Sequence, residues 1–173
     1  MKQEFPIRRI RLLLSFFMLA LFVSGLTVWP AAAELRFALQ LVPHNGPVGQ
    51  WLQTVLTAYE KVDAQYGFLY YGYDWLAFAH LVLAALFIGP WRDPVRNRWV
   101  LEFGIGACIA IFPLAFIAGA LRGIPLWWRF VDCSFGVIGL MVLWPCYDAV
   151  RRFEHAQIFK NKAYEKNALA GAR

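Results

Sequence analysis

The chain has 173 residues, of which 60% are hydrophobic, 17% aromatic and 16% charged, and its mean hydropathy is +0.49. This composition is too apolar for a soluble domain of the same length, so most of the apolar surface must face lipid. The net charge of +6 does not indicate a nucleic-acid binder, because the basic residues flank apolar runs instead of gathering on a polar domain.

The first apolar run extends from Leu12 to Trp29 without a charge and follows three arginines. At about 1.5 Å per residue it is long enough to cross a hydrocarbon core of about 30 Å. The basic start and the small-residue stretch 31–33 also fit a secretory signal peptide, although the apolar core exceeds the ~7–15 residues usual for one. We therefore expect a retained span over 12–29, with cleavage after Ala33 as the alternative.

The segment between the first and second spans predicts one amphipathic helix over 48–63, entered through the Asn45-Gly46-Pro47 turn. Its apolar residues recur at spacings of three and four, and its polar residues fill the opposite face. The apolar face is formed by Val48, Trp51, Leu52, Val55, Leu56, Tyr59 and Val62. Such a helix is expected to lie flat on the outer leaflet or to cap the membrane helices.

Three further apolar runs predict spans over 70–88, 99–121 and 130–147. Gly89-Pro90 is expected to end the second span, because proline offers no amide hydrogen and clashes with the preceding turn. Backbone groups in hydrocarbon must be satisfied internally. The predicted fold class is therefore all-α, a four-transmembrane-helix bundle with an outer-face amphipathic helix, in a single membrane domain over 1–173.

Small residues at helical spacing predict where these helices approach one another most closely. They are Gly104, Gly106, Cys108 and Ala110 in the third span and Gly136 and Gly139 in the fourth. Pro113 is expected to kink the third span. Cys108, Cys133 and Cys146 lie in apolar runs without the spacing of a metal site, so they are expected to behave as small hydrophobes, and neither a metal nor a cofactor is predicted.

The distribution of Lys and Arg predicts the orientation of the chain. If the N-terminus lies inside, thirteen of the seventeen Lys and Arg residues fall on the cytoplasmic side, and the other side holds only Arg36, Lys61, Arg122 and Arg129. We therefore expect a multi-pass protein of the bacterial inner membrane with both termini in the cytoplasm. The segment over 48–63 would then be periplasmic, and 151–173 would form a basic cytoplasmic tail.

Ionisable groups inside a bilayer are expensive and are the first candidates for chemistry. His80 stands six positions beyond Asp74, about 9 Å deeper in the second span, which places it near mid-membrane. It could act as a proton relay or a general acid/base, or it could be a structural residue bonded to another helix, for example through Ser134. Haem with two histidine ligands is not expected, because His44 and His155 lie in polar segments.

A second group of charges gathers at the predicted outer ends of the second to fourth spans. It comprises Asp74, Arg122, Arg129 and Asp132. The four charges could neutralise one another as a clamp that ties the helix ends together. Alternatively, they could line an outward-facing pocket for a headgroup or a small anion.

Glu102 lies one turn beyond Arg98 in the third span, at a spacing that favours an ion pair between them. In a catalytic interpretation, Glu102 or Asp132 would work with His80 as an acid and base pair. The spacing with Arg98 explains Glu102 without any such role.

Several stretches resemble a group of small bacterial polytopic membrane proteins of uncharacterised activity. They are 73–80, 89–97, 102–104, 122–125 and 132–136, together with Arg129. This resemblance covers about half of the chain, from the second span onward, and implies no particular activity.

A much weaker likeness, carried by Asp93-Pro94, Glu102, Pro113 and Asp132, is to the EXPERA family of sterol isomerases and sigma-2-type receptors. That family holds acidic residues on membrane helices around a lipid-like ligand. The order of the helices around these residues departs from the family, so isomerase chemistry is not implied.

These observations favour a non-catalytic membrane subunit or a binder of a lipid-like molecule. The alternatives are an intramembrane acid/base enzyme that uses His80 and a carboxylate on an apolar substrate, and a small proton-coupled transporter that works as an oligomer. No motif of a soluble catalytic domain is present in the sequence. The expected partners are the lipid bilayer, a lipid-like ligand, and either further copies of the chain or a membrane complex.

Overall fold

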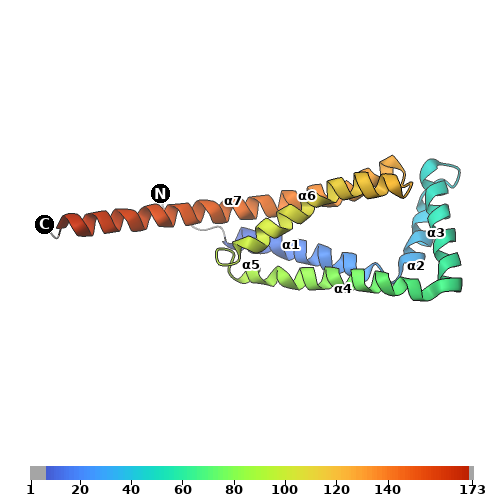
Figure 1. Cartoon of the computed structure of the whole chain (residues 1–173), viewed down its shortest axis with the longest axis horizontal. Helices are drawn as coiled ribbons and strands as arrows, with labels where there is room; N and C mark the ends of the chain where they lie inside the picture. The colour runs from blue at the N-terminus through green and yellow to red at the C-terminus, as the bar shows by residue number, and fades with distance from the viewer. Residues whose placement is uncertain (1–6, 172–173) are drawn as a thin grey trace. The chain divides into compact units, whose positions relative to one another are not determined.

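The computed structural model describes the backbone of residues 7–171 and the side chains of residues 7–158 (Figure 1). In this part of the chain every regular secondary-structure element is a helix, and short turns join them. The elements are α1 (Ile7–Leu26), α2 (Ala31–Leu41), α3 (Pro47–Tyr66), the 3-10 turn η1 (Gly67–Tyr70), α4 (Tyr71–Leu86), α5 (Ile88–Arg92), α6 (Arg98–Leu121) and α7 (Leu126–Gly171).

Four helical stretches are long and apolar enough to cross a membrane: Ile7–Leu26, Pro47–Arg92, Arg98–Leu121 and Leu126–Ile158. At most 33% of the most apolar window in each stretch is buried within the protein. Large apolar side chains are exposed to this degree where lipid is their solvent. The chain is therefore a multi-pass integral membrane protein that contacts the bilayer, and the predicted all-α class with four spanning helices is confirmed.

The chain forms two compact units. One unit contains the described residues up to Phe17 and from Leu86 onward, and the other contains Met18–Ala85. The first unit therefore holds α5, α6 and α7 with the beginning of α1. The second holds the rest of α1 together with α2, α3, η1 and nearly all of α4.

Within the first unit, α6 and α7 run side by side (Figure 1). A Cβ at Gly136 of α7 would lie 2.7 Å from the carbonyl oxygen of Cys108, and a Cβ at Gly139 would overlap the Cys108 sulfur. Gly104 of α6 is equally tight, since a Cβ there would meet two side chains at 2.7 Å. The predicted close contacts at these glycines are confirmed, whereas Gly106 has open space around it and lies outside the seam.

The core of the first unit extends from this seam to α1 and α5. Its buried side chains are Ile10, Leu14, Phe87, Val100, Leu101, Ile105, Val142, Leu143 and Val150. The rings of Phe17 and Phe87 meet edge to face, with centroids 4.8 Å apart. Cys108, Cys133 and Cys146 are free and buried, in agreement with their predicted role as small hydrophobes.

The short helix α5 is clasped against the beginning of α1. The indole nitrogen of Trp91 donates to the Ser15 hydroxyl at 3.0 Å, and Nε of Arg11 donates to the Trp91 carbonyl oxygen at 3.2 Å. The Arg11 guanidinium also lies 5.1 Å from the centroid of the Trp91 ring. Asn97 closes the loop after α5 by donating to the Gly89 carbonyl oxygen at 3.2 Å.

In the second unit, α2 and α3 lie side by side (Figure 1). Leu39, Leu52 and Leu56 are the large apolar side chains buried in these two helices. Nη2 of Arg36 forms an ion pair with Glu60 at 2.6 Å across the same two helices. The α2–α3 hairpin is therefore held together by these buried leucines and by the exposed ion pair between Arg36 and Glu60.

Two elements at the beginning of the chain differ from the sequence prediction. α1 starts at Ile7, so the arginines expected to precede the first span lie inside its first turns, where arginine is a good helix former. The segment after it was predicted to hold one amphipathic helix, but α2 forms there as well. Alanine favours helix strongly, so the run over 31–33 begins α2, although its small residues also fit a cleavage signal.

Two further differences concern proline. α4 ends at Leu86, two residues before the predicted end of the second span, and Gly89-Pro90 does not end a helix but lies inside α5, where Pro90 is in the first turn and its missing amide hydrogen is tolerated. α7 continues from Leu126 through Pro145 to Gly171 and does not end near 147. Of the predicted basic tail over 151–173, the side chains from 159 onward lie outside the described residues.

Candidate functional site

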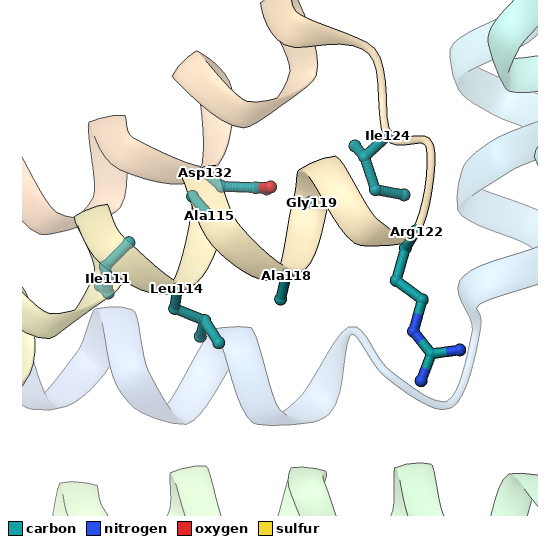
Figure 2. Close-up of a pocket in the computed structure, with 8 residues that line it drawn as sticks. All are labelled: Ile111, Leu114, Ala115, Ala118, Gly119, Arg122, Ile124 and Asp132. Atoms are coloured by element: carbon teal, nitrogen blue, oxygen red, sulfur yellow. The ribbon is translucent and has the colours of Figure 1, made fainter.

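An open pocket lies between α6 and α7, close to the short connection that joins them (Figure 2). Its volume is about 270 Å³, and it is lined by Ile111, Leu114, Ala115, Ala118, Gly119, Arg122, Ile124 and Asp132. This volume is slightly below the ~300–1,000 Å³ of typical small-molecule sites. A pocket of this size can hold a small molecule or part of a larger one.

Small residues of α6 create the space. Ala115, Ala118 and Gly119 face the pocket at spacings of three and four, which places them on one side of the helix. Ile111 lies eight positions before Gly119, so the apolar wall extends about 12 Å along the helix. The pocket thus runs from the helix ends toward the middle of the span.

Asp132 supplies the carboxylate of this pocket. It lies six positions after Leu126, about 9 Å along α7, and its side chain extends into the space between the two helices (Figure 2). The residue is half-buried. Within residues 7–158 its carboxylate forms neither an ion pair nor a hydrogen bond.

The two arginines near this pocket have other orientations. Arg129, one turn before Asp132, donates from Nε to the Ile124 carbonyl oxygen at 2.8 Å. Its side chain also covers Gly119, where an added Cβ would lie 3.0 Å from Arg129 Cδ. Arg122 lines the end of the pocket and extends away from Asp132 (Figure 2).

The clamp considered for these charges is therefore not built around Asp132, since Arg129 bonds to the backbone. Of the four charges in the pocket alternative, Arg122 and Asp132 line this cavity, whereas Asp74 and Arg129 are not among its lining residues. Asp74 belongs to the second unit, and there its Oδ1 accepts a hydrogen bond from the indole nitrogen of Trp29 at 2.9 Å.

His80 bonds within its own helix. Its Nδ1 lies 2.8 Å from the Leu76 carbonyl oxygen, and because a carbonyl oxygen can only accept, Nδ1 is the donor in this hydrogen bond. α1 passes closely, because a Cβ at Gly25 would lie 3.2 Å from His80 Cβ. Ser134, suggested as the partner of His80, donates to the Val131 carbonyl oxygen at 2.6 Å.

Glu102 forms the predicted ion pair with Arg98, at 3.0 Å between Oε1 and Nε. Arg98 also pairs with Glu154 of α7, a contact between residues 56 positions apart. Spacing along one helix could predict the first pair but not the second. Glu102 is therefore part of a structural bridge between α6 and α7, and this supports its structural interpretation.

The small residues that line the pocket were not recognised as site residues from the sequence. Ala115 and Gly119 stand four positions apart, the same spacing that marked the glycine seam, and this was the available signal. Among the described residues, no group of three or more His, Cys, Asp or Glu could hold a metal ion.

Comparison with known proteins yields no relative for the chain: no family model, no curated protein and no solved structure matches it. The candidate site therefore rests on the geometry of the pocket and on its carboxylate.

Proposed function

We propose that the chain is a non-catalytic binder of an amphipathic, lipid-like molecule held in the pocket between α6 and α7. The observation that carries this proposal is the carboxylate of Asp132, which has no partner within the described residues and extends into an apolar, half-open cavity. The head of the ligand would lie near Asp132 and Arg122. Its tail would follow Ile111 and Leu114 toward lipid.

The energetics support a ligand that donates hydrogen bonds. An aspartate at the centre of a spanning helix costs about 2.5–3.5 kcal/mol, and less toward the interface. A hydrogen bond to a charged group contributes about 1.5–3 kcal/mol. A hydroxyl or amine head would therefore offset most of the cost of placing Asp132 there.

The proposal includes a location. The excess of Lys and Arg on one side supports a bacterial inner-membrane protein with both termini in the cytoplasm. The pocket would then open in the outer half of the bilayer. Reporter fusions after Asn97 and after Gly123 test this orientation, with a cytoplasmic signal expected for the first and a periplasmic signal for the second.

The binding function is tested by lipid mass spectrometry on protein purified in a mild detergent. The Ala118→Leu variant fills the pocket, and Asp132→Asn removes the charge while keeping the shape. Ala110→Leu makes the same change at an exposed position of α6 that does not line the pocket, and serves as the matched control.

A bound molecule should be present in the native protein and in the Ala110→Leu control. It should be lost from Ala118→Leu and reduced at least about tenfold in Asp132→Asn, as expected for one charge-assisted hydrogen bond. A native protein without any bound amphiphile, or a filled pocket that retains it, would show that the pocket is not the binding site.

A further inference from the structure

Arginines without acidic partners gather where the beginning of α1 meets α5, in the first unit. We propose that Arg8 of α1 and Arg92 of α5 bind the phosphate of an anionic phospholipid beside Trp91. This site is separate from the pocket between α6 and α7 and shares no residue with it.

The clasp between α1 and α5 places the two arginines. Arg11 and Ser15, four positions apart on one face of α1, both contact Trp91. Arg8 lies three positions before Arg11, so it continues the same face by one turn toward the end of the helix. Because Arg92 follows Trp91 directly in α5, Arg8 and Arg92 belong to the two helices that this clasp joins.

Both guanidinium groups are available to an external anion. Arg8 and Arg92 are exposed, and no acidic group among residues 7–158 pairs with either of them. The acid that follows Arg92 in sequence is Asp93, whose Oδ1 accepts a hydrogen bond from the backbone nitrogen of Arg96 at 3.0 Å. That hydrogen bond gives the Asp93 carboxylate a role inside the loop after α5.

Neighbouring arginines of the same unit do have acidic partners. Arg98 is paired with Glu102 and Glu154, and Arg152 with Asp148 at 2.7 Å. Arg8 and Arg92 have no such partner among residues 7–158, and neither do the exposed Arg9 and Arg96.

The chemistry of the site matches a phosphodiester at the surface of a membrane. Guanidinium groups bind phosphate oxygens in pairs, and basic sites between membrane helices hold anionic headgroups. Tryptophan prefers the headgroup region. Leu12, in the turn after Arg8, is 73% exposed, so apolar surface for an acyl chain adjoins the site. This apolar surface favours a phospholipid over free inorganic phosphate.

Native mass spectrometry of the full chain, titrated with phosphatidylglycerol or phosphatidylcholine, tests the proposal. An arginine near the membrane surface contributes about fivefold to the binding of an anionic lipid. The double variant Arg8→Gln with Arg92→Gln should therefore bind phosphatidylglycerol about thirtyfold more weakly, while its weak binding of phosphatidylcholine stays unchanged.

Two matched variants separate a defined site from general attraction. Arg8→Lys with Arg92→Lys keeps the charge but loses the paired hydrogen bonds, so an intermediate loss is expected. Arg9→Gln removes one exposed charge from the same turn of α1, about 100° around the helix from Arg8, and should leave phosphatidylglycerol binding nearly unchanged.

An equal loss of phosphatidylglycerol binding in Arg9→Gln and in the single variants Arg8→Gln and Arg92→Gln would overturn the proposal, because net charge would then explain the binding. Full displacement of phosphatidylglycerol by an equal concentration of inorganic phosphate would overturn it as well, since the acyl chain would then contribute nothing.

Discussion

The contact between Gly136 and the backbone of Cys108 leads to a quantitative prediction for the α6–α7 seam. Replacing Gly136 with alanine would place a Cβ 2.7 Å from the Cys108 carbonyl oxygen. This is about 0.6 Å shorter than the shortest common carbon–oxygen contacts of ~3.3 Å. A backbone oxygen cannot rotate away as a side chain can, so the two helices must separate locally.

The magnitude follows from two opposing effects. Overpacking of a close interface costs about 1–3 kcal/mol, while alanine in place of glycine favours the helix by about 1 kcal/mol. We expect Gly136→Ala to lower the free energy of unfolding by up to about 2 kcal/mol. Gly106→Ala, where no atom lies within 4 Å of the added Cβ, should instead raise it by up to about 1 kcal/mol.

Reversible unfolding in mixed detergent micelles, followed by circular dichroism, measures both changes. The close neighbour of Gly139 is the Cys108 sulfur, so Cys108→Ala should partly rescue Gly139→Ala. The same change should not rescue Gly136→Ala, because the backbone oxygen remains. If Gly136→Ala is as stable as Gly106→Ala, or if Cys108→Ala rescues both seam variants equally, the described packing of α6 on α7 is wrong.

Three other predictions concern links between helices. Arg98→Lys keeps the charge but loses the planar guanidinium that reaches both Glu102 and Glu154, so the free energy of unfolding should fall by up to about 1 kcal/mol. An unchanged melting temperature would argue against this bridge. Glu60→Arg should destabilise the α2–α3 hairpin and Arg36→Glu should restore it, with a coupling of about 0.2–1 kcal/mol that declines as salt is raised. Gly25→Ala should lower the melting temperature, unlike Gly72→Ala, where the added Cβ meets open space.

The sequence predicts what the bilayer itself dictates. The start of α6 at Arg98 is one residue from the predicted start, because a spanning segment needs a fixed length of apolar chain. The contact at Gly136 could also be predicted, because only small residues let membrane helices approach closely. The ion pair of Glu102 with Arg98 follows from helical spacing alone.

Contacts that join distant segments could not be obtained in this way. Arg129 bonds to the Ile124 carbonyl oxygen and not to Asp132. This contact depends on the turn between α6 and α7, where Gly123 adopts a positive φ of 67°. The second partner of Arg98 depends on α7 continuing as a helix as far as Glu154. Spacing along one helix contains no information about either contact, so the availability of the Asp132 carboxylate had to come from the three-dimensional arrangement.

The continuity of α7 has a mechanical consequence. Its 46 residues correspond to roughly 69 Å, more than twice the ~30 Å thickness of the hydrocarbon layer. A single ladder of backbone hydrogen bonds therefore connects the segment around Asp132 with the distant terminus of the helix, and torsion applied at one end is transmitted to the other. Pro145 has no amide hydrogen, so one backbone hydrogen bond of α7 is missing there. The helix should therefore bend at Pro145 more easily than in the segments on either side.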